Sequence, residues 1–497
     1  MIKMKKSCCS CSSILFALFF VLPLILISRV GFSRRPLWIS SSVIKNGGNG
    51  HGQLHQKNED LINPEIRHKE LMNVIKNGGH GHEQLHQSKE DLINPERRQN
   101  KELINTTCSA KLKKLEGGLA RARARIRIYV KNSTQTRDPD YTPQGPVYWN
   151  ANAFHRSYLE MEKLFKVFIY EEGEPPLFHN GPCKSIYSME GNFISLMEIE
   201  PRFRTRDPEK AHVFLLPFSV TMMVNFIYDP NSNDASFINH IIVDYVNLIS
   251  AKYPFWNRSL GWDHFMLSCH DWGPIASSHS PYLFNNSIRA FCNANTSEGF
   301  NPSKDVSIPE VNLLTGETKG LLGGPSPSRR PILAFFAGGL HGPIRPILLD
   351  HWKTKIGDKL NEMQIYEYLP KTISYQNMMK KSRFCICPSG YEVASPRIVE
   401  ALYSGCVPVL ISDHYVAPFS DVLNWKAFSV VISVDDIPDL KKILKGISPR
   451  QYIRMQRRGV QVRRHFEVNS PPKRFDVFNM ILHSVWLRRL NARIRDQ

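Results

Sequence analysis

Short apolar runs alternate with longer stretches of helical spacing throughout the chain after residue 138. Before a Pro-, Gly- and Ser-rich break at 320–330, the runs are 167–170, 213–216 and 265–269, with a helical stretch at 235–251. After the break, they are 332–337, 384–387, 407–411 and 428–431. Because strands that alternate with helices form parallel sheets, the pattern predicts two α/β domains of Rossmann-like type, at 138–325 and 326–497.

A different pattern precedes this body. An uninterrupted apolar run at 14–27 lies between three basic residues on each side. With its flanking Ser and Cys residues, it predicts a signal-anchor transmembrane helix at 12–32, after a cytosolic tail at 1–11. A cleaved signal peptide is the alternative, although no cleavage site of the Ala-x-Ala kind follows the run.

Residues 33–137 are polar and carry an internal duplication. The sequence VIKNGG at Val43 recurs at Val74, and EDLINPE at Glu59 recurs at Glu90, an offset of 31 residues. Two copies rich in Gly, Asn, His and Gln cannot bury a core, so we predict a stem. Up to Arg137 the chain holds 24 Lys and Arg against 10 Asp and Glu, a net +14 of the total +19. The basic excess therefore belongs to this arm, and nucleic acid is not an expected partner.

The segment 384–412, FCICPSGYEVASPRIVEALYSGCVPVLIS, holds the densest candidate chemistry. Its pattern predicts a strand, a turn, a helix that begins after Ser395 and a second strand. Open α/β sheets bind ligands at the carboxyl ends of their strands, where Glu392, Arg397 and Glu400 are expected. Carboxylates accept sugar hydroxyls, and an arginine fork suits a diphosphate. An ordinary Rossmann-like unit with surface charges is the alternative.

Further blocks accompany this segment, in order from about residue 141 to about 434. They include KVFIYE from Lys166, TRDPEKAHVF from Thr205, GWDHF from Gly261, HDWGP from His270 and FFAG from Phe335. Together these blocks resemble the exostosin-like glycosyltransferases, family 47, and in particular their plant members. The resemblance implies the GT-B architecture, in which two Rossmann-like domains face a cleft. It also implies a nucleotide-sugar donor and inversion at the anomeric carbon.

The glycine turn after 332–337 is the expected diphosphate site. Gly338 and Gly339 precede a helix that begins near Pro343 and carries Arg345 in its first turn. Backbone N–H groups of such a turn cradle phosphate; a plain loop with glycines for packing is the alternative.

The two glutamates of the later segment complete the expected donor site. We assign Glu400 to the ribose hydroxyls and Glu392 to the donor sugar. Arg397 is assigned to the phosphate, or to an ion pair with one of those glutamates.

The general base is expected in the first domain. Asp263 and His264 lie at the start of the strand 265–269, and His270 and Asp271 lie at its end. Position favours Asp271, while a structural role in the interdomain loops is the alternative for all four residues. The pair Asp138-Pro-Asp140 lies in the linker rather than after a strand, so no metal site and no cofactor other than the donor substrate are expected.

These features predict a Golgi type II membrane glycosyltransferase with its body in the lumen. The expected partners are a nucleotide sugar, with UDP as the carrier, a cell-wall polysaccharide acceptor and the Golgi membrane. A homo- or hetero-oligomer with other glycosyltransferases is left open. A non-catalytic scaffold subunit of such a complex is the alternative function.

Sequons and cysteines agree with a luminal body. Five N-x-S/T sites follow the anchor, at Asn105, Asn132, Asn257, Asn285 and Asn295. Seven cysteines lie beyond the anchor, and Cys269 with Cys292 is the expected disulfide pair. Cys385, Cys387 and Cys406 are expected to be buried rather than to bind a metal, and their disulfide pairing is left open.

Overall fold

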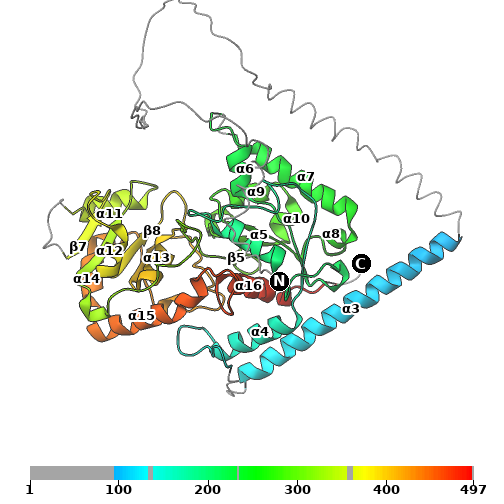
Figure 1. Cartoon of the computed structure of the whole chain (residues 1–497), viewed down its shortest axis with the longest axis horizontal. Coiled ribbons are helices and arrows are strands. Elements are labelled where there is room, and N and C mark those ends of the chain that lie inside the picture. Colours follow the sequence, from blue (N-terminus) through cyan, green and yellow to red (C-terminus); the bar gives the residue numbers. More distant parts are fainter. Residues whose placement is uncertain (1–94, 132–137, 232–233, 355–361, 495–497) are drawn as a thin grey trace, which may run out of the picture. The chain divides into compact units, whose positions relative to one another are not determined.

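The computed structural model describes residues 95–131, 138–231, 234–354 and 362–494 (Figure 1). The expected tail, anchor and most of the stem lie outside these ranges. None of the helices within them is long and apolar enough to cross a membrane. Residues 13–107 and the remainder form separate compact units, and only the unit that contains residues 108–497 is considered further.

Two five-stranded parallel sheets form the body, which confirms the prediction of two parallel-sheet α/β domains. The first sheet has the order β1-β2-β3-β4-β5, with strands Val167–Ile169, Val213–Leu215, His264–Ser268, Ile288–Phe291 and Val306–Ser307. The second has the order β10-β9-β8-β6-β7, with strands Val430–Ile432, Val407–Ile411, Ser382–Pro388, Ile332–Ala337 and Met363–Tyr366. The sequence pattern did not predict the short strands β4, β5 and β7.

Helices connect the strands of each sheet, as Figure 1 shows. In the first half they are α4 Ala151–Leu164, α5 Met189–Ile199, α6 Val220–Phe226, α7 Ser236–Lys252, α8 Pro254–Ser259, α9 Gly273–Ser278 and α10 Pro281–Asn285. In the second half they are α11 Ile344–Trp352, α12 Tyr375–Lys381, α13 Arg397–Ser404, α14 Leu440–Gly446, α15 Pro449–Val462 and α16 Val477–Asn491. A long helix, α3 (Pro95–Lys131), precedes the body.

The second sheet reverses its strand order between β6 and β8. From β6 the chain proceeds to β7 on one side, whereas β8 leads to β9 and β10 on the other. The connections from the two strands therefore leave in opposite directions, and a crevice opens at their carboxyl ends. The glycine turn after β6 and the turn at Gly390 after β8 both lie at this switch point.

The C-terminal helix α16 returns to the first half. It packs against α4, β4 and β5, and Figure 1 shows it in red beside α4 and α5. Its Trp486 is fully buried in a hydrophobic cluster that also contains Leu267 of β3 and Leu402 of α13. One continuous core thus joins residues of both halves, which fixes the edges of the two sheets relative to each other.

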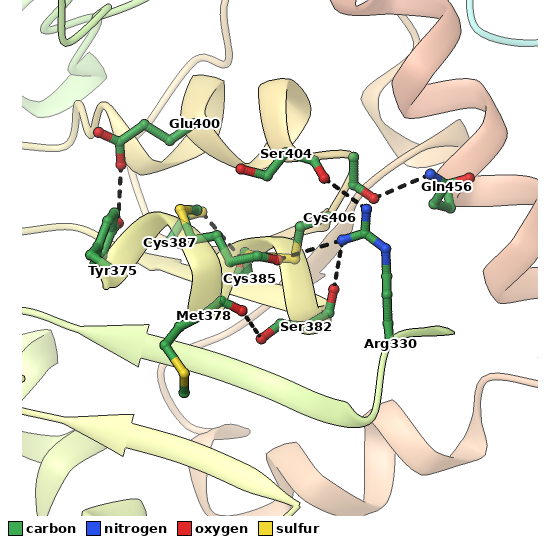
Figure 2. The surroundings of a disulfide bond; sticks show 12 residues. Arg330, Tyr375, Met378, Ser382, Cys385, Cys387, Glu400, Ser404, Cys406 and Gln456 are labelled. Carbon is green, nitrogen blue, oxygen red and sulfur yellow. Dashed lines mark hydrogen bonds between the residues drawn. A yellow bond between two sulfur atoms is a disulfide. The ribbon is translucent and has the colours of Figure 1, made fainter. Parts of the chain in front are cut away.

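Two disulfides lie close to the strand ends. Cys269–Cys292 joins the residues that follow β3 and β4, which confirms the expected pair. Cys385–Cys406 joins β8 to the residue before β9 (Figure 2). Sequence analysis expected both cysteines to be buried, which is confirmed at 1% and 2% exposure, and left their pairing open. Cys406 precedes the strand beside β8, so the parallel pairing of β8 and β9 brings the two sulfur atoms together.

Candidate active site

The two turns at the switch point touch each other through glycines. Gly342 has a φ of +69°, and a Cβ there would lie 1.8 Å from the carbonyl oxygen of Gly390. A Cβ on Gly390 would lie 2.8 Å from an Nη atom of Arg345, and one on Gly338 would lie 2.5 Å from an Nη atom of Arg397. Side chains at these positions would displace either a neighbouring turn or an arginine, so the glycines allow the guanidinium groups to approach the backbone.

Arg345 and Arg397 form a positively charged pair at this place. Arg345 is only 7% exposed, and Arg397 donates from Nη2 to the carbonyl oxygen of Ala337 at 3.0 Å. Arg345 makes one long contact, 3.5 Å from Nη1 to the carbonyl oxygen of Gly339. The Nε atoms of both arginines are buried without a hydrogen-bond partner. Burial, followed by the charge of Arg397, lowers the pKa of Arg345 to about 10.

No carboxylate of the described residues forms an ion pair with either guanidinium. Glu400 instead accepts hydrogen bonds from Tyr375 Oη at 3.0 Å and from Asn312 Nδ2 at 3.2 Å. Figure 2 shows the hydrogen bond between Tyr375 and Glu400, to the left of the Cys385–Cys406 disulfide. The alternative in which Arg397 pairs with a glutamate is therefore not what the structure contains. A buried guanidinium beside a half-buried one, with no ion-paired carboxylate among the described residues, is a favourable site for an anion.

Glu392 lies where the two halves meet. Its Oε2 accepts a hydrogen bond of 2.7 Å from Nδ2 of Asn293, which follows β4. The same Nδ2 lies 3.2 Å from Oε2 of Glu298 and 3.1 Å from the carbonyl oxygen of Asp271. Burial, followed by the charge of Glu298, raises the pKa of Glu392 to about 7. The donor-sugar glutamate proposed from the sequence is thus in direct contact with the first half.

A buried glutamate of α5, Glu190, fixes the carboxyl end of β3. Its Oε1 accepts from the backbone N–H groups of Cys269 and His270, at 2.8 and 3.0 Å, and from Ser268 Oγ at 2.9 Å. Its Oε2 accepts from Ser219 Oγ at 2.5 Å and from the backbone N–H of Thr221 at 3.0 Å. Three of these hydrogen bonds hold the end of β3, and the other two join the same carboxylate to the start of α6.

His270 and Asp271 extend from that fixed end. The Nδ1 of His270 accepts from the backbone N–H of Trp272 at 3.1 Å, and burial lowers the pKa of the ring. Burial raises the pKa of Asp271, against a hydrogen bond from Tyr187 and the charge of His270, which lower it. A neutral imidazole thus lies beside a carboxylate of increased basicity, which is an arrangement suited to proton transfer.

Asp263 and His264 are not brought to this group. Asp263 is buried at the amino end of β3, where it accepts from Ser259 Oγ at 2.5 Å and from Arg258 Nη2 at 3.1 Å. His264 Nε2 lies 2.8 Å from Tyr170 Oη, and its Nδ1 lies 2.8 Å from Asp263. Successive residues of a strand are about 3.3 Å apart, so residues at the two ends of β3 lie in different surroundings. Asp263 therefore has a structural role, which was the alternative to a general base in the sequence analysis.

The Asp-x-Asp pair is occupied by an arginine. Arg474 Nη1 lies 2.8 Å from Asp138 Oδ1 and 3.0 Å from Asp140 Oδ2. Within the described ranges, no three His, Cys, Asp or Glu side chains gather as metal ligands.

The expected glycosylation sites differ in their surroundings. Asn257 and Asn285 are exposed, whereas Asn295 is 7% exposed and donates from Nδ2 to Glu298 Oε1 at 2.8 Å. The side chain of Asn105 and all of Asn132 lie outside the described residues, and glycosylation at the five sites stays a prediction.

Comparison with known proteins identifies the family. A model described as the exostosin GT47 domain matches residues 161–447. An Arabidopsis thaliana protein named a probable glycosyltransferase is 66% identical over 385 residues, which cover 78% of this chain and 73% of that one. The chain belongs to the exostosin GT47 family. As a member of it, the protein is a glycosyltransferase, and the resemblance deduced from the sequence blocks is confirmed.

Other relatives of this GT47 protein have more specific names. A second A. thaliana probable glycosyltransferase is 57% identical over 77% of this chain and 82% of its own length. A probable glucuronoxylan glucuronosyltransferase of A. thaliana is 29% identical, over 58% of this chain and 65% of that one. A probable beta-1,4-xylosyltransferase of the same plant is 25% identical, over 64% of this chain and 80% of that one.

The GT47 chain also contains a site residue that sequence analysis missed. Glu310, three residues after β5, is 5% exposed and has no hydrogen-bond partner among the described residues. Burial, followed by the charge of Asp271, raises its pKa well above the usual value, while Arg397 and Arg345 act in the opposite direction. The sequence VSIPE has an acidic residue after an apolar run, but β5 has only two residues and was not recognised as a strand. Glu310 is therefore near enough to Asp271 and to both arginines for their charges to shift its pKa.

Proposed function

We propose that this GT47 protein transfers a sugar from a UDP-sugar to a cell-wall polysaccharide. The protein would be a single-pass type II protein of the Golgi membrane, with the described body in the lumen. The reaction would invert the anomeric carbon and require no metal ion. The names of the A. thaliana relatives, which specify xylan-directed enzymes, support a wall polysaccharide as the acceptor.

The observation that carries the proposal is the arginine pair at the switch point. Arg345 and Arg397 are held at the glycine turn, where the charge of Arg397 contributes to the lowered pKa of Arg345, and no carboxylate of the described residues forms an ion pair with either. A diphosphate would supply the missing negative charges and stay stabilised as it leaves the sugar. Glu400, one helical turn from Arg397, is then placed for the ribose, and Glu392 for the donor sugar.

In the proposed reaction, an acceptor hydroxyl attacks the anomeric carbon on the face opposite the diphosphate. The new C–O bond forms as the bond to the phosphate oxygen breaks, and the electron pair leaves with UDP toward Arg345 and Arg397. The hydroxyl proton passes to the carboxylate of Asp271. The raised pKa of Asp271 makes its ionised form a stronger base than an ordinary aspartate.

Two arginines in place of a divalent cation support a metal-free reaction, as does the occupation of Asp138 and Asp140 by Arg474. We expect turnover to persist in excess chelator. A strict requirement for added Mn²⁺ or Mg²⁺ would overturn this part of the proposal.

The test uses the full chain, purified in detergent, with a panel of nucleotide sugars and wall oligosaccharides. Arg345→Ala is expected to reduce kcat/KM by about a hundredfold or more, because it removes charge stabilisation of the leaving group. Arg329→Ala, at an exposed arginine of the same half, is the matched control and should leave kcat/KM unchanged. Undiminished transfer by Arg345→Ala would contradict the site.

A further inference from the structure

Beside the arginine pair, the second half carries a group of exposed rings. Tyr391 is 77% exposed, Tyr368 is 72% exposed and His341 is also exposed. The rings of His341 and Tyr391 stack with their centroids 5.3 Å apart and their planes at 21°. A Cβ on Gly339 would lie 3.0 Å from Tyr368 Oη and 3.5 Å from His341 Nε2, so the glycine turn lies against both rings. We call His341, Tyr368 and Tyr391 the aromatic rim.

A cluster of exposed aromatic side chains leaves apolar surface in contact with water, which is unfavourable in free energy until a ligand covers it. An exposed tyrosine offers a large apolar face to water, and its burial in a complex is favourable. Tyr391 already has a neighbour on one face, so the rim presents a preformed platform rather than separate flexible rings. The rim contains no carboxylate, lysine or arginine, which favours a neutral ligand with apolar C–H faces.

The position of the rim decides between the possible neutral ligands. Three side chains of the second half form a row: Glu400, then Arg397, then Arg345. Glu400 is hydrogen-bonded to Tyr375, and Arg397 to the carbonyl oxygen of Ala337. Arg345 lies at Gly339 and Gly390. Tyr391 directly follows Gly390, so the rim lies at the end of the row opposite Glu400. In a bound nucleotide sugar with its ribose at Glu400 and its phosphates at the arginines, the transferred sugar points to the rim, whereas the nucleobase points away.

We infer that the aromatic rim is a subsite for the acceptor polysaccharide, which stacks the apolar faces of its sugar rings on Tyr391, His341 and Tyr368. This inference rests on the proposed order of the nucleotide sugar in the site. It adds a binding surface for the acceptor on the half that holds the donor. The adjacent Glu392 accepts a hydrogen bond from Asn293 of the first half, which also donates to the carbonyl oxygen of Asp271. A polysaccharide chain on the rim therefore lies next to Asp271.

The test separates acceptor binding from nucleotide binding. The full chain in detergent is run on native gels that contain a neutral xylan, xyloglucan or a neutral galactan, and the binding of UDP is measured separately by calorimetry. We expect at least one neutral polysaccharide to retard the wild-type protein. Tyr391→Ala should weaken that retardation about fivefold, and Tyr391→Phe should preserve it, because stacking needs the ring and not the hydroxyl.

Two variants serve as controls. Tyr282→Ala removes an exposed ring of α10, in the first half, and should leave retardation unchanged. Arg345→Ala should abolish UDP binding and retain the retardation, so a failure of the proposed donor site is distinguished from a failure of the rim.

The inference is overturned if none of the three polysaccharides retards the wild-type protein, or if Tyr391→Ala is retarded like wild type. It is also overturned if Tyr391→Ala weakens UDP binding by the same factor, because the rim would then hold the nucleobase. Equal loss in Tyr282→Ala would indicate a general surface effect and would contradict it as well.

Discussion

At the scale of single residues, burial sets the chemistry of the site. Glu310, Glu392 and Asp271 are ordinary acidic residues in the sequence, yet the folded chain raises the pKa of each of them. The first cause is the same in all three: loss of water around the carboxylate, which disfavours its charged form. That residues 392 and 271 are acidic is visible in the sequence, whereas the rise in their pKa values follows from burial in the folded chain.

Because Glu310 has no hydrogen-bond partner among the described residues, we expect its substitution to lower activity without lowering stability. Glu310→Gln keeps the shape and the neutral state that burial already favours, and no hydrogen bond to a described residue is lost. We expect the free energy of unfolding to change by less than about 0.5 kcal/mol, while kcat falls about tenfold or more through the loss of an acidic group between Asp271 and the arginines. Urea unfolding and initial rates check both values, and a large loss of stability with unchanged kcat would contradict the placement.

The pKa of about 7 at Glu392, against a usual value of 4.5, predicts a dependence of stability on pH. The folded chain retains a proton that the unfolded chain releases above pH 4.5, so this group reduces stability as the pH rises toward 7. Glu298→Gln removes the neighbouring charge that raises this pKa. The variant should therefore lose less stability than wild type between about pH 5 and about pH 8, by roughly 0.5 kcal/mol at this half-exposed site.

The groups that face Glu392 are Glu298, Asn293 and Asp271. Thermal unfolding of both proteins across the pH range measures the difference. Glu317→Gln, at an exposed glutamate, should follow the wild-type curve. Parallel curves for wild type and Glu298→Gln would show that the two carboxyl groups do not interact.

At the scale of elements, strand ends place the functional groups. The carboxyl end of β3 is held by three hydrogen bonds to Glu190 and by the disulfide from Cys269 to Cys292. In the second half, the strand reversal between β6 and β8 brings two glycine turns into contact. The strands that the apolar runs predicted therefore also indicated where the candidate site lies. Asn293 and Glu310 were missed because they follow β4 and β5, which are too short to be recognised in the sequence.

Removal of the disulfide at the end of β3 tests this anchoring. The double variant Cys269→Ser, Cys292→Ser should lower the free energy of unfolding by about 2–4 kcal/mol, because the unfolded chain regains the freedom of the loop. It should also lower kcat, since Asp271 follows Cys269 by two residues. Cys387→Ala, at a buried thiol outside both disulfides, is the control and should retain activity. Wild-type activity in the double variant would show that Glu190 alone holds the strand end.

At the scale of the whole molecule, the C-terminal helix unites the two halves. Trp486 of α16 is fully buried against Phe165 of the first half, and its Nε1 donates to Ser157 Oγ at 3.3 Å. The same buried cluster includes Leu402 of the second half. Because the core is continuous, the two sheets should unfold together rather than as independent domains.

Trp486→Ala tests this coupling. The loss of a buried indole should reduce the free energy of unfolding by about 3–5 kcal/mol. Urea unfolding, followed at the same time by far-UV circular dichroism and by UDP binding, should show one coincident transition that moves to lower urea. Val460→Ala, on the exposed face of α15, should leave the midpoint unchanged. Separate transitions for the two signals would contradict a single cooperative core.

The sequence by itself determined the α/β class, the two parallel sheets and the family, and it also indicated the proposed donor-side residues. These depend on local patterns, since apolar runs, glycine turns and the Glu392, Arg397 and Glu400 spacing are visible in adjacent letters. The tertiary structure alone decided that Asp263 is separate from Asp271, that Cys385 pairs with Cys406, and that Glu310 and Asn293 enter the site. Each of those outcomes depends on contacts between residues distant in the chain, and on the burial that only packing creates. The pairing of strand ends and the loss of water around charged groups are properties of the folded chain.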